Sequence, residues 1–198
     1  MDIRNYFKVT KSNDSQEATN IDNQLNNDKS NNDIAVFVDG SVFNNGKKNA
    51  YGGIGIYFSD NDSRNISKKL EKNKKISNNI AEIIACIEAI KIIVNDISYN
   101  ENNKIIIYSD SEYTINCITK WSKLWIAHDW QRPVGSKLMP IKNKDLIIEL
   151  YILYYKYKCK FVHVKSHQIQ PLVKTSVDYF KWNGNMMADK LAKKASGL

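Results

Sequence analysis

The stretch that decides the fold is Ile34-Ala35-Val36-Phe37-Val38-Asp39-Gly40-Ser41. Its five consecutive apolar residues are too few for a buried helix and predict a central strand over 34–40, covered on both faces. The apolar run ends on the carboxylate of Asp39. An acid at the carboxyl end of such a strand faces the crevice in which open α/β sheets bind ligands. Asp-Gly is also a common hairpin turn, and this stretch alone favours the turn.

Composition narrows the class of protein. The 198 residues fit one domain plus a tail. No apolar run approaches the roughly 20 residues of a membrane span, and the N-terminus lacks the apolar core of a secretory signal. The three cysteines, Cys86, Cys117 and Cys159, are too widely spaced for a disulfide framework or a zinc site. We therefore expect no membrane association and a reducing compartment within the cell, nuclear or cytoplasmic.

The charge is unevenly distributed. The chain has a net charge of +8, but residues 1–32 contain four basic and five acidic side chains, which leaves +9 for the remainder. A basic domain suggests a polyanionic partner such as a nucleic acid. A lysine-rich solvated surface is the alternative, and charge alone does not separate the two.

The order of expected elements predicts the fold class. Residues 1–33 form a polar tail that cannot bury enough apolar surface to order itself, and a single domain is expected over 34–198. The pattern predicts a β-meander followed by alternating helices and strands, and therefore an α/β fold with a mixed five-stranded sheet flanked by helices. The expected strands are 34–40, 51–58, 63–70, 104–109 and 159–164; the expected helices are 79–97, 111–120, 143–156 and 184–196, with loops after the tryptophan-rich stretch 121–130 and over 165–182.

Four acids are candidates for one site. Asp39 and Asp110 follow two strands that should be neighbours, Glu82 lies in the first turn of the helix expected over 79–97, and Asp189 lies in the last helix. Each has a plain structural alternative. Glu82 fits a capping box with Asn79, Asp110 fits an N-cap, and Asp189 fits an ion pair four residues before a lysine.

Taken together, the acids favour a metal site. Carboxylates that converge on one crevice repel each other unless cations neutralise them. Oxygen ligands without cysteine or clustered histidine favour Mg²⁺ or Mn²⁺ over Zn²⁺. Two such cations about 4 Å apart would clamp a phosphodiester during in-line displacement. His167 follows the last strand at the same edge of the sheet.

The chain resembles a type 1 ribonuclease H over residues 34–197. The resemblance depends on the order and spacing of five short motifs, because each motif alone is weak. They are Val38-Asp39-Gly40-Ser41, Asn79-Ile80-Ala81-Glu82, Tyr108-Ser109-Asp110-Ser111, Val164-Lys165-Ser166-His167 and Gly184-Asn185-Met186-Met187-Ala188-Asp189-Lys190-Leu191-Ala192.

The resemblance implies an endonuclease that hydrolyses the RNA strand of RNA–DNA hybrids and leaves 5′-phosphate and 3′-hydroxyl ends. It implies that Asp39, Glu82, Asp110 and Asp189 hold two Mg²⁺ ions, which Mn²⁺ can replace. One ion would activate water and the other would stabilise the leaving oxygen. His167 would aid proton transfer or product release, and the protein is expected to be a monomer.

The resemblance also implies residues that bind the substrate. The tryptophan-rich stretch is similar to the basic protrusion with which cellular members of the family grip the DNA strand, and Trp121 is expected to face nucleic acid while Trp125 packs. A phosphate pocket maps to Lys75, Ser77 and Asn143. Residues that contact the ribose 2′-hydroxyls map to Asn45, Asn78 and Asn79.

Two departures from the family pattern matter. The loop between His167 and Asp189 is longer than usual, and residues 126–128 are less basic than in the cellular enzymes. Two other functions therefore stay open: a nuclease of the same superfamily that acts on DNA, of the integrase or resolvase type, and a catalytically silent hybrid-binding module. The three asparagines disfavour the first alternative, and the complete set of acids disfavours the second.

The first eight residues suggest a docking peptide. Ile3, Tyr6 and Phe7 would lie on one side of a single helical turn at the end of the polar tail. The stretch resembles the sliding-clamp-binding peptide at the N-terminus of the replication factor C large subunit, which also opens Met-Asp-Ile-Arg. This resemblance implies binding to a PCNA-like clamp at replicating DNA, with the rest of the tail as a tether.

Overall fold

The sheet is organised around its central strand, β1 (Asp33–Phe43), in the computed structural model of the chain. The structure describes residues 33–71, 76–166 and 168–198. All of them belong to one unit, Asn32–Leu198. The predicted docking residues Ile3, Tyr6 and Phe7 lie outside the described residues, as do Lys75 and His167.

The predicted mixed five-stranded sheet is confirmed. β1 pairs antiparallel with the following strand β2 and parallel with β4, and β4 pairs parallel with β7. Burial is nearly continuous along β1 and β2 because helices cover both faces of the sheet. The order across the sheet is β3-β2-β1-β4-β7, with bounds β2 (Tyr51–Tyr57), β3 (Ile66–Lys69), β4 (Lys104–Ser109) and β7 (Lys160–His163).

The prediction that the first strand ends at residue 40 is wrong. β1 continues through Gly40 to Phe43 because its antiparallel pairing with β2 continues to Phe43 opposite Tyr51. Its parallel pairing with β4 ends earlier, at Phe37 opposite Tyr108. Asp39 is therefore an interior residue of a strand that has lost one of its two neighbours, and the hairpin turn comes later, at Asn44, which has a left-handed φ of 54°.

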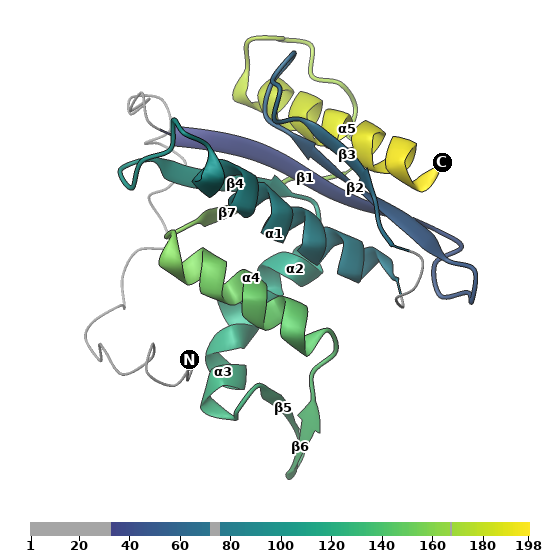
Figure 1. Cartoon of the computed structure of the whole chain (residues 1–198), viewed down its shortest axis with the longest axis vertical. Helices are drawn as coiled ribbons and strands as arrows, with labels where there is room; N and C mark the ends of the chain where they lie inside the picture. Colours follow the sequence, from purple (N-terminus) through teal and green to yellow (C-terminus); the bar gives the residue numbers. More distant parts are fainter. Residues whose placement is uncertain (1–32, 72–75, 167) are drawn as a thin grey trace. The chain divides into compact units, whose positions relative to one another are not determined.

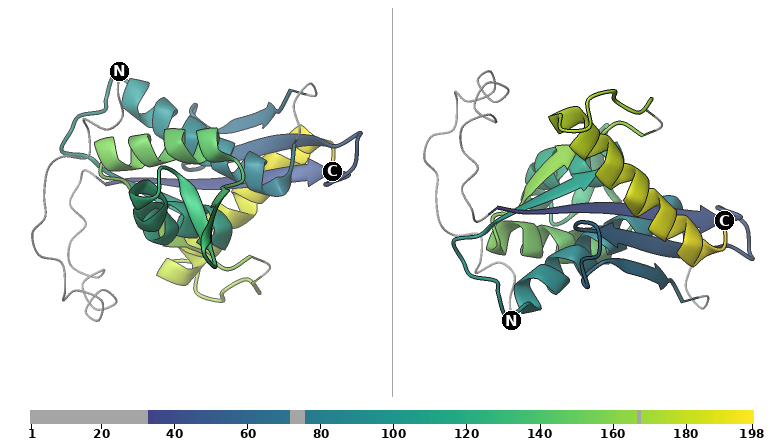
Figure 2. Two further views of the ribbon diagram at one scale, coloured as in Figure 1. Left: turned by 90° about the horizontal axis from the view of Figure 1, so that it is seen from below. Right: turned by 90° about the horizontal axis from the view of Figure 1, so that it is seen from above.

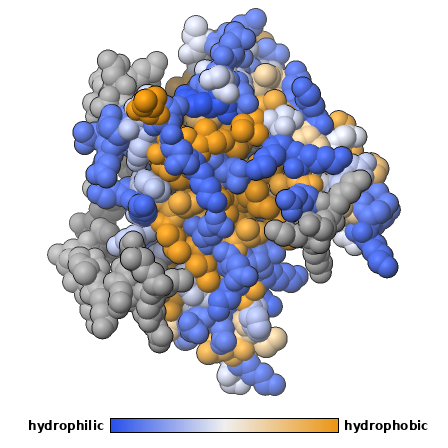
Figure 3. Space-filling view, viewed as in Figure 1, coloured by the Kyte–Doolittle hydropathy of each residue, from blue (hydrophilic) through white to orange (hydrophobic). Residues whose placement is uncertain are grey.

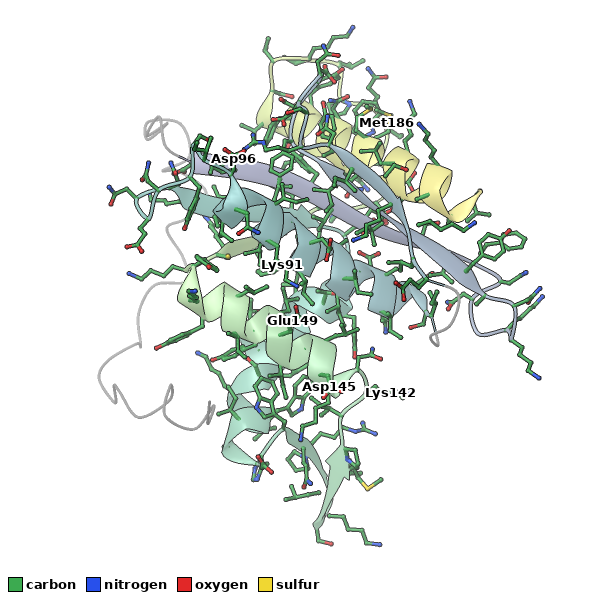
Figure 4. All side chains as sticks on the ribbon, viewed as in Figure 1. Lys91, Asp96, Lys142, Asp145, Glu149 and Met186 are labelled. Carbon is green, nitrogen blue, oxygen red and sulfur yellow. The ribbon has the colours of Figure 1, made fainter. Side chains whose placement is uncertain are left out.

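Helices form one layer on each side of the sheet. Figures 1 and 2 show α1 (Asn78–Asn95) and α4 (Lys144–Lys156) on one face and α5 (Val177–Ser196) on the other. The main core, rich in isoleucine, lies between the sheet and α1 with α4. Lys91 of α1 and Glu149 of α4 point toward each other in Figure 4 and form an ion pair of 2.7 Å.

The first turn of α1 differs from the predicted one. The N-cap is Ser77, whose hydroxyl accepts a hydrogen bond from the Ile80 amide at 3.4 Å. Asn78 and Asn79 are therefore the first two helical residues and are exposed. Asn79 is not the cap, so the capping box with Glu82 does not form and the Glu82 side chain is left for another role.

The middle of the chain contains a β-hairpin that the sequence does not predict. A helical segment made of α2 (Glu112–Asn116), the π-helix η2 (Cys117–Trp121) and α3 (Ser122–Ala127) is followed by the hairpin of β5 (Gln131–Val134) and β6 (Lys137–Pro140). Pro133 and Pro140 favour a loop, but both are tolerated here because this sheet has only edge strands. Gly135, with φ of 58°, allows the turn.

The last helix begins earlier than predicted. Ser176 caps α5 by accepting a hydrogen bond from the Tyr179 amide at 3.1 Å, so Tyr179, Phe180 and Trp182 are helical and not part of a loop. Gly184 suggests a break, yet it is buried inside the helix because an added Cβ there would lie 2.3 Å from the Phe37 ring. The glycine is needed for close packing of α5 on β1.

The remaining sequence expectations concern surface and redox state. All three cysteines are buried and unpaired. Among the described residues, no helix has both the length and the apolar content to cross a membrane. On the face drawn in Figure 3, apolar side chains gather over the middle and polar ones surround them.

Candidate active site

The register of the central strands places Asp39 beside Asp110. Phe37 is opposite Tyr108 in the parallel pair of β1 and β4. Asp39 lies two residues further along β1, and Asp110 directly follows the last residue of β4. Alternation along a strand puts residues two apart on the same face. The two acids therefore lie at the same level of the sheet, where β4 ends and β1 continues.

Glu82 reaches the same point from α1. The helix lies directly on β1 at Gly40, where an added Cβ would be 2.4 Å from the Glu82 backbone nitrogen. Only glycine allows this approach without displacement of the helix. The sequence Asp39-Gly40 therefore supplies a carboxylate and the space for a second carboxylate beside it.

Asp39, Glu82 and Asp110 form a compact group, named here the carboxylate triad. Each contributes an oxygen atom, and these atoms lie within 4.8 Å of one another. Asp39 and Glu82 are 7% and 8% exposed. Desolvation, with the charges of Asp110 and Asp189, raises the pKa of Asp39 to about 7, and burial followed by the Asp39 charge raises the pKa of Glu82 well above its usual value. Burial likewise raises the pKa of Asp110.

The triad fits a divalent cation. Within the described part of the chain, the buried Oε2 atom of Glu82 has no hydrogen-bond partner. A buried oxygen without a partner costs free energy, and a bound cation would remove that cost. A cation would also offset the repulsion among three carboxylates, and an all-oxygen donor set suits Mg²⁺ or Mn²⁺.

Asp189 lies next to the triad on α5. Its charge raises the pKa values of Asp39 and Asp110. Its carboxylate also accepts a hydrogen bond from Lys193 at 2.8 Å, which is the ion pair that its spacing in the sequence suggests. Asp189 and Asp110 both line a cavity of about 240 Å³, named here the catalytic cavity, together with Met186, labelled in Figure 4.

Two further residues act on Asp110. Asn185 of α5 hydrogen-bonds the Asp110 side chain and lowers its pKa, and His163 at the end of β7 lowers it through its charge. Asn185 is buried, and its Oδ1 has no hydrogen-bond partner among the described residues. The sequence contains signals for both residues, since Asn185 precedes Asp189 by one helical turn and His163 ends a strand. Neither residue is among the site residues predicted from the sequence.

The predicted 2′-hydroxyl-binding residues lie close to the triad in the chain. Asn78 and Asn79 are exposed at the start of α1, one turn before Glu82. Asn45 is exposed in the turn after β1. Ser77 caps the helix by accepting a hydrogen bond from the Ile80 amide, and a hydroxyl that accepts in this way can still donate its own hydrogen.

The tryptophan-rich segment forms a separate surface. Trp121 is 40% exposed and Trp125 only 8%, as predicted. The Trp121 ring lies edge-on to Tyr113 at 6.1 Å, and Asn143 hydrogen-bonds the Tyr113 side chain. Both tryptophans line a cavity of about 470 Å³ with Arg132 and Lys142. This combination of aromatic and basic side chains suits contact with a nucleic acid backbone.

Known proteins match this chain in sequence and in fold. The family model for RNase H matches residues 31–197. A ribonuclease H of Schizosaccharomyces pombe is 35% identical over 161 residues, which cover 81% of this chain and 52% of that protein. A ribonuclease H of Clostridium botulinum is 33% identical over 135 residues, which cover 68% of this chain and 83% of that protein.

The chain thus spans about half the length of the yeast relative. Among solved structures, LC9-RNase H1, described as a type 1 RNase H, shares the fold with a TM-score of 0.58 and 21% identity, covering 84% of this chain and 72% of that chain. The family match extends over nearly all described residues and includes the carboxylate triad. The chain belongs to the RNase H family and has the fold of a type 1 ribonuclease H.

Proposed function

We propose that the protein is an endonuclease that hydrolyses the RNA strand of RNA–DNA hybrids with the aid of divalent cations. The observation that carries this proposal is the carboxylate triad, in which one oxygen of each side chain lies within 4.8 Å of the others. In addition, the buried Oε2 of Glu82 has no hydrogen-bond partner among the described residues. The names of the sequence relatives supply the reaction class.

The side chains have distinct roles in this proposal. Asp39, Glu82 and Asp110 would hold two Mg²⁺ ions, with Asp189 as a fourth carboxylate beside them. Bound cations of this kind activate water and stabilise the charge that develops on the leaving oxygen. Asn185 would position the Asp110 carboxylate and favour its ionised form, against the burial that raises its pKa.

His167 is assigned proton transfer to the leaving group or help with product release. It follows the last strand of the sheet, close in sequence to Lys165 and Ser166, which line the catalytic cavity. Geometry for this residue lies outside the described part of the chain.

Recognition of RNA is assigned to the start of α1. Asn78 and Asn79 are exposed amides one helical turn before Glu82, and Asn45 is exposed in the turn after β1. An amide can both donate to and accept from a ribose 2′-hydroxyl. Lys75, Ser77 and Asn143 would contact phosphates. Trp121, with Arg132 and Lys142 nearby, would contact the DNA strand.

A cleavage assay tests the proposed function. The purified protein with Mg²⁺ should cut the RNA strand of a hybrid and leave matched DNA–DNA and RNA–RNA duplexes intact. Addition of EDTA should stop the reaction. Cleavage of the DNA duplex would favour a DNA-acting nuclease of the superfamily, and hybrid binding without cleavage would favour a silent binding module.

A further inference from the structure

A second cavity joins the catalytic cavity. It has a volume of about 420 Å³ and is named here the strap cavity, because residues 168–171 form one wall. The end of β7 and the first turns of α5 complete it. Lys165, Gln168 and Trp182 line both cavities, so the strap cavity continues the site that contains Asp110 and Asp189.

The strap cavity is built by the segment in which the sequence departs from the RNase H pattern. By its resemblance to that pattern, the segment between His167 and Asp189 is expected to be longer than usual, and α5 begins at Val177. The indole N–H of Trp182 donates a hydrogen bond to the Gln168 carbonyl at 3.0 Å, which fixes the ring against the strap. The extra residues therefore hold an aromatic side chain at the junction of the two cavities.

The lining combines apolar walls with positive charge. Ile169, Pro171 and Trp182 offer apolar surface. Lys165 and Lys181 are the lysines of this lining, and Asp178 is its one acidic residue among those that the structure describes. Aromatic rings beside lysines are typical of sites that stack a base and contact its phosphate. The volume lies within the range of about 300–1,000 Å³ usual for small-ligand pockets.

We propose that the strap cavity binds an unpaired nucleotide of the RNA strand, with its base on Trp182 and its phosphate near Lys165 and Lys181. The inference rests on the proposed function, which places the RNA strand in the catalytic cavity. Because the two cavities share three residues, the strand that occupies one is the strand that can extend into the other. A base within a duplex is stacked on its neighbours and does not offer a free face to Trp182.

The test compares hybrids that share one paired sequence. One hybrid is blunt, two carry a few unpaired ribonucleotides at the 5′ or 3′ end of the RNA strand, and two carry the same extensions on the DNA strand. One of the RNA-extended hybrids should have a KM at least about fivefold below that of the blunt hybrid, the lower end of what base stacking contributes. Equal KM values for all five hybrids would overturn the proposal. An equal gain from a DNA extension would overturn the assignment to the RNA strand.

The variants test the lining residues. Lys181→Ala and Trp182→Ala should each reduce the preference for the extended hybrid, read as the ratio of the two KM values within one variant. Trp182→Phe keeps a ring and should retain most of the preference even if Trp182→Ala does not fold. Lys174→Ala is the matched control, because this exposed lysine lies on the same segment and lines neither cavity. Loss of the preference in Lys174→Ala alone would contradict the proposed lining.

Binding in EDTA separates this inference from the proposed function. Fluorescence anisotropy of the labelled hybrids should show the same preference of wild-type protein for the RNA extension, without any cleavage. Absence of cleavage in Mg²⁺ together with this preference would reject the proposed function and keep the strap cavity as a nucleotide site. Cleavage without any preference for the RNA extension in either assay would keep the proposed function and reject the strap cavity as a nucleotide site.

Discussion

The ionised form of Asp39 destabilises the metal-free folded protein, although a metal ligand at this position must be ionised. Desolvation and the neighbouring charges of Asp110 and Asp189 raise its pKa to about 7. In the unfolded chain an aspartate releases its proton near pH 4, so between about pH 4 and 7 the folded metal-free protein binds the extra proton. The contribution of Asp39 to the free energy of unfolding is therefore fully present below about pH 4 and is lost as the pH rises through 7.

Asp39→Asn should stabilise the metal-free protein at about pH 8 by about 1–3 kcal/mol, since each pKa unit corresponds to about 1.4 kcal/mol and solvent screens part of it. The amide keeps the volume and removes the charge. At about pH 4 the gain should disappear, because Asp39 is then neutral in the wild type as well. Urea unfolding in EDTA at the two pH values measures both effects. A variant less stable than the wild type at the higher pH would contradict the repulsion described here.

The exposed asparagines lead to a prediction about substrate length. A hybrid with a single ribonucleotide should be cut much more slowly than one with about four or more in a row. Asn45, Asn78 and Asn79 would contact successive 2′-hydroxyls, and a single 2′-hydroxyl leaves some of these amides without a hydrogen-bond partner. Single-turnover rates on the two substrates measure the difference. Equal rates would remove these residues from RNA recognition.

At the scale of elements, the contact between α1 and β1 positions Glu82. Gly40→Ala would place a methyl group 2.4 Å from the Glu82 backbone nitrogen, so the helix must shift. We expect a loss of about 1–3 kcal/mol in the free energy of unfolding, as for other overpacked cores. We also expect cleavage to fall, because Glu82 moves away from Asp39. Thermal unfolding and initial rates measure the two effects.

Gly46→Ala is the control for that substitution. Unlike Gly40, Gly46 has a backbone conformation that favours glycine, with φ of 80°, and an added Cβ there meets no atom within 4 Å. Its substitution should cost stability through the backbone alone and leave cleavage unaffected. Equal loss of activity in both variants would show that the close approach at Gly40 is not what positions Glu82.

Elements whose signals are local and periodic could be predicted from the sequence. The apolar run before Asp39 indicates a buried strand, and the isoleucines of α1 recur at helical spacing. The end of β1 could not be predicted, because it depends on pairing with β2 and not on the run itself. The β5–β6 hairpin contains two prolines that favour a loop, and only its lack of further neighbours makes them acceptable.

The candidate site likewise contains residues that could be predicted from the sequence and residues that could not. Asp39 and Asp110 could be paired from the sequence because parallel neighbours share a register. Glu82 needed the observed cap at Ser77 to exclude the capping box. Asn185 was missed because its position one helical turn before Asp189 does not show what its amide contacts, and that contact with Asp110 appears only in the structure.

At the scale of the whole chain, the polar tail adds a separate prediction. A labelled peptide of residues 1–15 should bind a eukaryotic-type sliding clamp saturably, because Ile3, Tyr6 and Phe7 would present one apolar face. Peptide with Tyr6→Ala and Phe7→Ala is the control and should not bind. Absence of binding at clamp concentrations of about tens of micromolar, an upper range for a useful tethered contact, would leave the tail without this partner.

The central claim is that the carboxylate triad performs the cleavage. The most direct measurement compares Asp110→Asn with the wild type, for cleavage of a hybrid in Mg²⁺ and for binding of the same hybrid in EDTA. The substitution removes one ligand charge with little change in volume, so we expect cleavage to be lost and binding to be retained. Turnover near that of the wild type would contradict the assignment of Asp110, and with it the triad as the catalytic centre.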